Sequence, residues 1–281
     1  MPGTPPADMP RELHACTATD LATHTVHSLS RDTPPSDAAA WLTDNGYDAA
    51  PVYDDGPIGF LHTDDVTTDD EGDVLDDHLT PLTIDYMISG DAAFPTLLDA
   101  LIDHPVYFLG GHNNVTGILT RADLNTAPAR IYLFDRITYL EEHLRELIMD
   151  KKPDWKNTPV TVDALEDIQD RYEDAQTANI ALDEIHYAQF STLETIVTSV
   201  EACWQTCDFS NKGTAETRLH KITELRNDVA HANLLVENTD SNDFLSSGRT
   251  TENLYNTLTT IKDVLTHLQD AGYDPDTAQA T

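Results

Sequence analysis

The residues best suited to chemistry in this chain lie close together, in the stretch Leu225–His231. Within it, Arg226, Asn227 and His231 bring together a guanidinium, an amide and an imidazole. Such a group stands out because the chain of 281 residues carries 50 Asp and Glu against only 16 Lys and Arg, a formal net charge of −34. We therefore take these three residues as the candidate site of chemistry.

This stretch belongs to a segment predicted to be helical, from residue 214 to about residue 236. On a helical wheel at about 100° per residue, one face is apolar and should be buried, namely Leu219, Ile222, Leu225 and Val229. The opposite face is polar and spans about 60°, with His220, Glu224, Asn227 and His231. Arg226 lies near the edge of the apolar face, about 140° from His231.

One ideal helix therefore cannot aim Arg226 and His231 at the same point, which leaves three interpretations. The long arginine side chain curls round the helix, or two copies meet about a two-fold axis so that Arg226 of one chain supports His231 of the other. The second arrangement predicts a homodimer with a composite cleft. In the third, the polar face is only solvated, and Arg226 packs its aliphatic stem along the edge of the core.

A second candidate pair, Thr120 and Asp123, belongs to a pattern that the first half of the chain contains twice. One copy reads Gly-Phe-Leu-His-Thr-Asp-Asp and places His62 and Asp65 where the other, Gly-Ile-Leu-Thr-Arg-Ala-Asp, has Thr120 and Asp123. Thr-x-x-Asp is also a helix-capping box, in which threonine and aspartate each accept a backbone amide of the other. The pair is thus a helix cap, a ligand-binding pair or both.

Each copy of this pattern follows a helix and two strands. The predicted elements are a helix at 36–45 with strands at 50–53 and 58–61, and a helix at 94–102 with strands at 106–109 and 115–119. An internal repeat of this kind indicates two similar units packed on each other.

Helix, strand, strand and then G-x-x-T-x-x-D opening a second helix resembles the pattern of a tandem CBS domain pair. The resemblance implies two β-α-β-β-α units within residues 15–127, at about 18–68 and 78–127. In that family the threonine and aspartate contact the phosphate and ribose of an adenine nucleotide, which carries over to Thr120 and Asp123, with His62 and Asp65 at the matching positions of the first copy. It implies binding of AMP, ATP or a related adenosyl ligand, with no other cofactor required.

From about residue 128 to residue 272 the strand signals stop and helical periods take over. The fold class expected for the whole chain is therefore α/β plus all-α, and the second part is a bundle of four or five helices. These helices are expected at 130–150, 162–177, 181–207, 214–236 and 252–268. The first should bury one stripe, made of Ile131, Phe134, Ile137, Leu140, Leu144, Leu147 and Ile148. Residues 1–14 and 273–281 are expected to be disordered tails.

An R-x4-H motif with an amide after the arginine, in the penultimate helix of a small bundle, resembles the HEPN domain. Many HEPN domains are metal-independent endoribonucleases that act as dimers, whereas others only dimerise or bind nucleotides. The resemblance implies that His231 is the acid/base or activates the 2′-hydroxyl of RNA. Arg226 would stabilise charge on the phosphate and Asn227 would position the backbone, with a cyclic phosphate as product.

The acidic composition limits how RNA could be held. A chain of charge −34 should repel RNA, but at about 1 M salt the Debye length is only about 3 Å, so both this repulsion and the usual gain from counterion release are largely screened. Affinity would then rest on stacking at Tyr187, Phe190 or Trp204, although these aromatic residues suit a core better. The composition also resembles that of halophilic archaeal proteins.

Other features narrow the setting. Two metal-binding alternatives are weak. Cys203 and Cys207, considered with His220, are better explained as buried cysteines on an amphipathic helix, and His220, Glu224 and His231 do not have the H-E-x-x-H spacing, so no metal site is predicted. The chain has no run of about 18 apolar residues, no signal peptide at its start and no disulfide framework. We expect a cytoplasmic protein without a membrane span.

Two functions remain open from the sequence. In the first, an adenine-nucleotide-sensing CBS pair regulates a HEPN-type endoribonuclease that works as a homodimer on RNA, with an antitoxin-like protein as a further partner. In the second, the helical part has lost cleavage, and the protein is a non-catalytic, ligand-sensing module for regulation or dimerisation.

Overall fold

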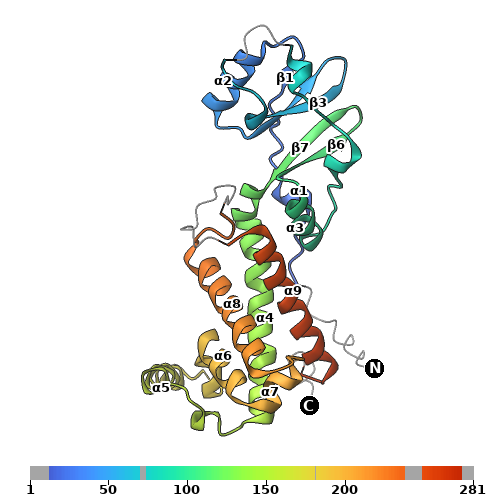
Figure 1. Cartoon of the computed structure of the whole chain (residues 1–281). Coiled ribbons are helices and arrows are strands. Elements are labelled where there is room, and N and C mark those ends of the chain that lie inside the picture. Colours follow the sequence, from blue (N-terminus) through green and yellow to red (C-terminus); the bar gives the residue numbers. More distant parts are fainter. Residues whose placement is uncertain (1–12, 70–73, 181, 238–248, 274–281) are drawn as a thin grey trace, which may run out of the picture. The chain divides into compact units, whose positions relative to one another are not determined.

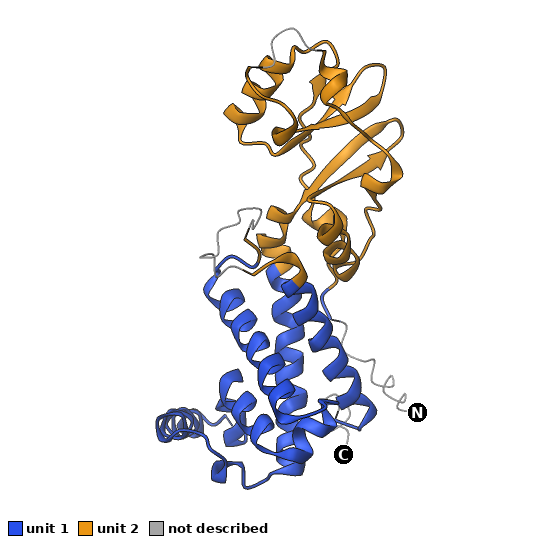
Figure 2. Cartoon of the chain, in the orientation of Figure 1, with its two compact units in different colours: residues 1–14, 130–235, 253–281 blue, residues 15–129, 236–252 orange. Residues whose placement is uncertain are grey.

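The computed structural model describes residues 13–69, 74–180, 182–237 and 249–273. The chain divides into two compact units (Figures 1 and 2). The sheet unit comprises residues 15–129 and 236–252, and the helical unit comprises the rest, with the main division between Ala129 and Arg130. No helix in the described ranges is long and apolar enough to cross a membrane.

The sheet unit contains the same arrangement of strands twice. Its first sheet has the order β1 (Leu29–Ser30), β2 (Ala49–Tyr53), β3 (Pro57–His62) and β4 (Thr80–Pro81). Its second has the order β5 (Met87–Ile88), β6 (Val106–Gly111) and β7 (Asn114–Thr120). In the first sheet, β1 pairs in parallel with β2, and β2 pairs antiparallel with β3. In the second, β5 pairs in parallel with β6, and β6 pairs antiparallel with β7. The predicted repeat is confirmed.

One helix crosses over within each copy, as the sequence predicts. These helices are α2 (Pro35–Asn45) and α3 (Phe94–Asp103), and a short α1 (Ala18–Leu21) precedes both. The helix α2 ends at Gly46, whose φ of +67° lies in the left-handed region that glycine adopts without steric cost. The two sheets share a core in which the ring centroids of Phe60 and Phe108 are 5.0 Å apart.

The helix expected after each motif is shorter than predicted. A single 3-10 turn begins inside each motif, η1 (Thr63–Asp65) in the first and η4 (Arg121–Asn125) in the second, and a third turn, η2 (Leu75–His78), lies beyond the first motif. In the first copy the turn stops because Val66 has extended backbone angles. In the second, only Thr126 separates η4 from α4 (Ala127–Lys151). A further turn, η3 (Ile84–Tyr86), leads into β5.

The helical unit is built around α4. The helices α8 (Lys212–His231) and α9 (Thr251–Asp270) lie along it (Figure 1). Arg130 of α4 donates to the carbonyl of Asp228 in α8, and Gln269 of α9 donates to the hydroxyl of Tyr139 in α4. The remaining elements are η5 (Trp155–Asn157), α5 (Val162–Thr177), η6 (Glu184–Tyr187), α6 (Phe190–Ser199) and α7 (Glu201–Thr206). The second part of the chain is therefore helical, as expected.

Two predicted helices have different limits in the structure. The segment 181–207 is not one helix, because extended angles at Val200 separate α6 from α7 and η6 precedes both. The segment 214–236 starts earlier, at Lys212, and ends earlier, at His231. It ends there because Ala232 adopts φ +57° and the amide of Asn233 bonds to the carbonyl of Asp228 at 2.9 Å.

The buried stripe predicted for α4 is wrong at its N-terminal end. Ile137 and the residues after it are buried, but Ile131 is 52% exposed and Phe134 is 49% exposed. Successive steps of three residues fall about 60° short of a full turn each, so three steps from Leu140 back to Ile131 reach the opposite face. Two large apolar side chains therefore stand on the surface of the helical unit.

Candidate functional site

The sheet unit contains a cavity of about 260 Å³ to which both repeats contribute. It is lined by Thr23, Thr25, His27, Gly46, Tyr47, Asp48, Ala49, Ile118, Thr120, Ala122 and Asp123. We call this the ligand cavity. The structure therefore brings Thr120 and Asp123 of the second repeat together with residues that follow α1 and α2 in the first.

Two features of the first repeat shape the wall of the ligand cavity. The backbone of Thr23 pairs with that of Ile118, with N–O distances of 2.8 and 3.0 Å, so the chain after α1 joins β7. The rings of His27 and Tyr47 are stacked, with centroids 5.7 Å apart and planes inclined by 18°. A nearly parallel aromatic pair of this kind offers a flat surface to a planar ligand.

Thr120 and Asp123 form the capping box that the sequence predicts. The backbone amide of Thr120 donates to Oδ2 of Asp123 at 2.7 Å, and the Thr120 hydroxyl donates to the same oxygen at 3.1 Å. Burial raises the pKa of the Asp123 carboxyl, and the two bonds from Thr120 oppose that shift. Because both bonds use Oδ2, Oδ1 is the oxygen that can accept from a ligand. The two interpretations, cap and ligand-binding pair, are compatible.

The corresponding residues of the first repeat have local roles and are not among those that line the ligand cavity. Nδ1 of His62 accepts from the amide of Asp64 at 3.2 Å, and the carbonyl of Asp65 lies 2.9 Å from Nδ1 of His78. The pairing of Leu29 with Val52 in the first sheet corresponds to that of Met87 with Phe108 in the second. By this register, Asp85 and Asp103 of the second repeat occupy the positions that His27 and Tyr47 occupy in the first. The structure thus does not bring His62 and Asp65 into the same site as Thr120 and Asp123.

Sequence reasoning missed His24, which joins the N-terminal segment to β7. Its Nε2 lies 2.8 Å from the carbonyl oxygen of Thr19, and its Nδ1 lies 3.2 Å from that of Thr116. A carbonyl oxygen only accepts, so both nitrogens can bond at once only in the imidazolium form. These two carbonyls raise the pKa of His24. No local pattern indicates this contact, because His24 and Thr116 are far apart in the chain.

In the helical unit, the face that the wheel predicts is confirmed. Leu219, Ile222 and Leu225 are fully buried, whereas Asn227 and His231 are exposed. His231 is the last residue of α8. Among the described residues, no contact joins Arg226 to His231.

Arg226 turns toward α4, where it meets a carboxylate that the sequence did not indicate. Its Nε lies 3.9 Å from Oε1 of Glu141, and Oε2 of Glu141 accepts from Nη2 of Arg145 at 3.0 Å. Glu141 and Arg145 are largely buried, and the side chain of Arg226 is 31% exposed. The guanidinium is thus partly exposed beside a carboxylate.

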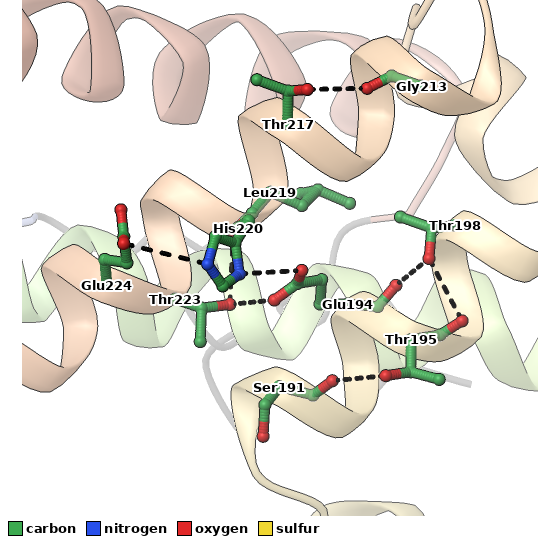
Figure 3. Close-up of polar contacts among 10 residues, drawn as sticks. All are labelled: Ser191, Glu194, Thr195, Thr198, Gly213, Thr217, Leu219, His220, Thr223 and Glu224. Atoms are coloured by element: carbon green, nitrogen blue, oxygen red, sulfur yellow. Dashed lines mark hydrogen bonds and ion pairs between the residues drawn. The ribbon is translucent and has the colours of Figure 1, made fainter. Parts of the chain in front are cut away.

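A second polar cluster joins α6 and α8 (Figure 3). Glu194 of α6 accepts from the hydroxyl of Thr223 and lies 3.4 Å from Nδ1 of His220, whose Nε2 is 3.8 Å from Glu224. The side chain of Glu194 is 17% exposed and that of His220 is 63% exposed. His220 therefore belongs to a cluster that joins α6 and α8. Its partner Glu194 is 26 residues away in the sequence and is revealed only by the packing of the two helices.

The structure supports neither metal-binding alternative. Among the residues it describes, no three His, Cys, Asp or Glu side chains are arranged to hold a metal ion. Cys203 and Cys207 are buried, and burial raises the pKa of the Cys203 thiol to about 11 and that of Cys207 further still. Phe190 is a core residue, as its sequence context suggests, while Tyr187 and Trp204 are half-buried.

Comparison with known proteins gives one family. The CBS domain family model matches residues 18–70. Curated proteins give no match. Among solved structures, CBSX2 from Arabidopsis thaliana is 20% identical and covers 41% of this chain and 95% of its own, with a TM-score of 0.36. CBSX2 in complex with AMP is 22% identical, covers 41% and 97%, and also has a TM-score of 0.36.

A putative acetoin utilization protein, AcuB, from Vibrio cholerae is 16% identical, covers 39% of this chain and 87% of its own, and has a TM-score of 0.35. TM-scores this low carry no argument about what this chain binds. The family match does define the class of the first part: residues 18–70 are a CBS domain, in a mixed α/β region that a helical region follows.

Proposed function

We propose that the chain is a ligand-sensing protein in which an adenine nucleotide, or a related adenosyl ligand, binds the ligand cavity and regulates a HEPN-type endoribonuclease in the helical unit. The observation that carries the sensing half is that Thr120 and Asp123 line a cavity together with the stacked rings of His27 and Tyr47. The adenine base would stack on these rings, and a ribose hydroxyl would donate to Oδ1 of Asp123.

Calorimetric titration with AMP tests this half. Asp123→Asn keeps an acceptor for the amide of Thr120 but removes the charge that a ribose hydroxyl would meet, so we expect affinity to fall roughly tenfold, as for a hydrogen bond to a charged group. The matched control is Asp65→Asn, which changes the equivalent residue of the first repeat outside the cavity and should leave affinity unchanged. Equal affinity of both variants for AMP would remove Asp123 from the site.

The proposed catalytic half uses the exposed end of α8. His231 takes the proton of a ribose 2′-hydroxyl, and the oxygen then attacks the adjacent phosphorus. The bond from phosphorus to the 5′-oxygen of the next nucleotide breaks, that oxygen takes a proton from water to become a hydroxyl, and a 2′,3′-cyclic phosphate forms. Arg226 stabilises the charge that builds on the phosphate oxygens, and Asn227 positions the backbone. The mechanism needs no metal ion.

A homodimer would place an arginine beside His231, which a single copy of α8 does not. Arg226 points toward α4 and away from His231, so the proposal is that Arg226 of one chain serves His231 of its partner. Ile131 and Phe134 support this, because two half-exposed apolar side chains on one helix suit burial against a second copy. The net charge of −34 favours assembly at high salt, and we propose that the protein works in the cytoplasm of a halophilic archaeon.

Incubation with mixed RNA and a chelator in molar KCl tests the catalytic half. His231→Ala should abolish cleavage, and His220→Ala is the matched control because it removes another exposed imidazole from the same face of the same helix. Cleavage that both variants retain would show that a contaminant or another site is responsible.

A second function is favoured by the contact between Arg226 and Glu141. A guanidinium already paired with a carboxylate holds a phosphate less strongly, which suits a helical unit that only dimerises or binds a partner such as an antitoxin-like protein. In that case AMP binds as before, but neither wild type nor any variant cleaves RNA.

A further inference from the structure

The charge on the lining of the ligand cavity selects among adenosine ligands, and this inference rests on the proposed function of that cavity. Of the residues that the structure describes around it, none is Lys or Arg, whereas two, Asp48 and Asp123, carry carboxylates. Sites that hold polyphosphates normally supply cations, backbone amides or a metal ion to neutralise the phosphate oxygens. This lining supplies two carboxyl groups instead.

The one cation within the motif is held elsewhere. Arg121 stands between Thr120 and Asp123 in the sequence, but its Nε donates to the carbonyl of Leu101 at 2.9 Å and its Nη2 to that of Ile102 at 3.3 Å. These carbonyls belong to the C-terminal turn of α3, which favours a cation. Reaching a phosphate would require Arg121 to give up both bonds.

The backbone amide of Thr120 already bonds to an anion. The amide and the hydroxyl of Thr120 both donate to Oδ2 of Asp123, so the carboxylate occupies the place where a phosphate oxygen would lie. The turn that follows, Arg121–Asn125, is a short 3-10 turn and not an α-helix with a developed dipole. A phosphate oxygen at Thr120 would therefore have to compete with the carboxylate of Asp123 for the same amide and hydroxyl.

The volume of the cavity, like its charge, favours a nucleoside over a nucleoside triphosphate. Its volume of about 260 Å³ lies just below the range of roughly 300–1,000 Å³ that is usual for drug-sized ligands. A nucleoside is of the size such a cavity encloses, and a triphosphate tail would extend beyond it. Outside the cavity the tail would meet the field of a chain with net charge −34.

We propose that the ligand cavity selects an adenosine whose 5′ substituent carries no negative charge, and that it discriminates against adenine polyphosphates. In this arrangement the adenine base lies against Tyr47 and a ribose hydroxyl donates to Asp123, so the 5′ group meets a lining whose described residues include the carboxylates of Asp48 and Asp123 but no Lys or Arg. These carboxylates repel a phosphate at the 5′ position, do not repel an uncharged 5′ group, and attract a cationic one.

Calorimetric titration of the full chain at about pH 8, where histidine is ordinarily neutral, tests this selectivity. The probes are adenosine, 5′-amino-5′-deoxyadenosine, AMP and ATP. At about 0.1 M salt we expect ATP to bind at least roughly tenfold more weakly than adenosine, with AMP between them and the amino compound at least as tight as adenosine. The ratio should shrink at about 2 M salt because screening removes the repulsion.

Two variants separate charge from shape. Asp48→Asn should bring the dissociation constant for ATP closer to that for adenosine. Ala122→Lys, at an exposed position of the lining, should raise ATP affinity roughly tenfold and leave adenosine unchanged, whereas the neutral control Ala122→Gln should change neither. ATP binding as tight as adenosine in the wild type overturns this inference alone. If no probe binds, the proposed sensing function fails and this inference fails with it.

Discussion

His24 should give the sheet unit a pH-dependent stability that Gln cannot reproduce. Its two ring nitrogens face the carbonyls of Thr19 and Thr116, and these contacts raise its pKa above the ordinary 6.5. The folded unit therefore binds this proton more tightly than the unfolded chain. The stabilisation is complete below the ordinary pKa and is lost as the pH rises through the raised one.

The magnitude follows from two hydrogen bonds made by a charged but exposed ring. A hydrogen bond to a charged group contributes about 1.5–3 kcal/mol when shielded from water. Because the ring of His24 is exposed, solvent screening reduces the contribution of the pair to about 1 kcal/mol. Above the raised pKa the neutral ring has only one N–H. The other ring nitrogen is then an acceptor that faces a carbonyl oxygen, which is also an acceptor, so one of the two hydrogen bonds is lost. No charged side chain contributes to the shift, and Tyr53 is the titratable side chain that lines the same surface hollow.

Urea unfolding of the wild type and His24→Gln, followed through amide signals of the sheet unit, measures this difference. At about pH 5.5 the wild type should be more stable than the variant by about 1 kcal/mol, and at about pH 8.5 the difference should nearly vanish. Comparing the two proteins at each pH cancels the other titrating groups. A difference that does not change with pH would refute the reasoning, as would an NMR titration that places the pKa of His24 at or below its ordinary value.

Three further outcomes follow from packing. Gly59→Ala should destabilise the sheet unit by about 1–3 kcal/mol in urea unfolding, because the added Cβ would lie 2.7 Å from the carbonyl oxygen of Thr80 in the neighbouring strand. Leu225→Ala should cost the helical unit about 2–5 kcal/mol, whereas the exposed neighbour variant Glu224→Ala should stay within about 0.5 kcal/mol. Phe134→Ser should leave the helical circular dichroism unchanged but shift a dimer toward monomer in sedimentation, and an unchanged mass would exclude this face from the interface.

Much of the local structure could be predicted because local rules decide it. The helix α2 ends where Gly46 permits a left-handed turn, and the capping box at Thr120 and Asp123 needs only residues three apart. The buried face of α8 follows from the wheel, since Leu225 and its apolar neighbours share one side. The repeat was visible because both copies use the same order of helix and strands.

The rest depends on contacts between distant parts of the chain, or on backbone angles that residue type does not dictate. Glu141 meets Arg226, and Glu194 meets His220, only after the helices have packed. The end of α8 depends on Ala232, a residue that rarely adopts a positive φ and that the sequence would place inside a helix. The ligand cavity likewise depends on the segment after α1 joining β7.

The most direct test of the central claim is the rate of RNA cleavage, in molar KCl, as adenosine or AMP is titrated while calorimetry reports occupancy of the ligand cavity. We predict that the wild-type rate changes at least roughly fivefold as the cavity fills, and that the half-maximal change coincides with the measured dissociation constant. Cleavage at every ligand concentration should depend on His231. A rate that stays constant while the cavity fills would contradict the proposed regulation.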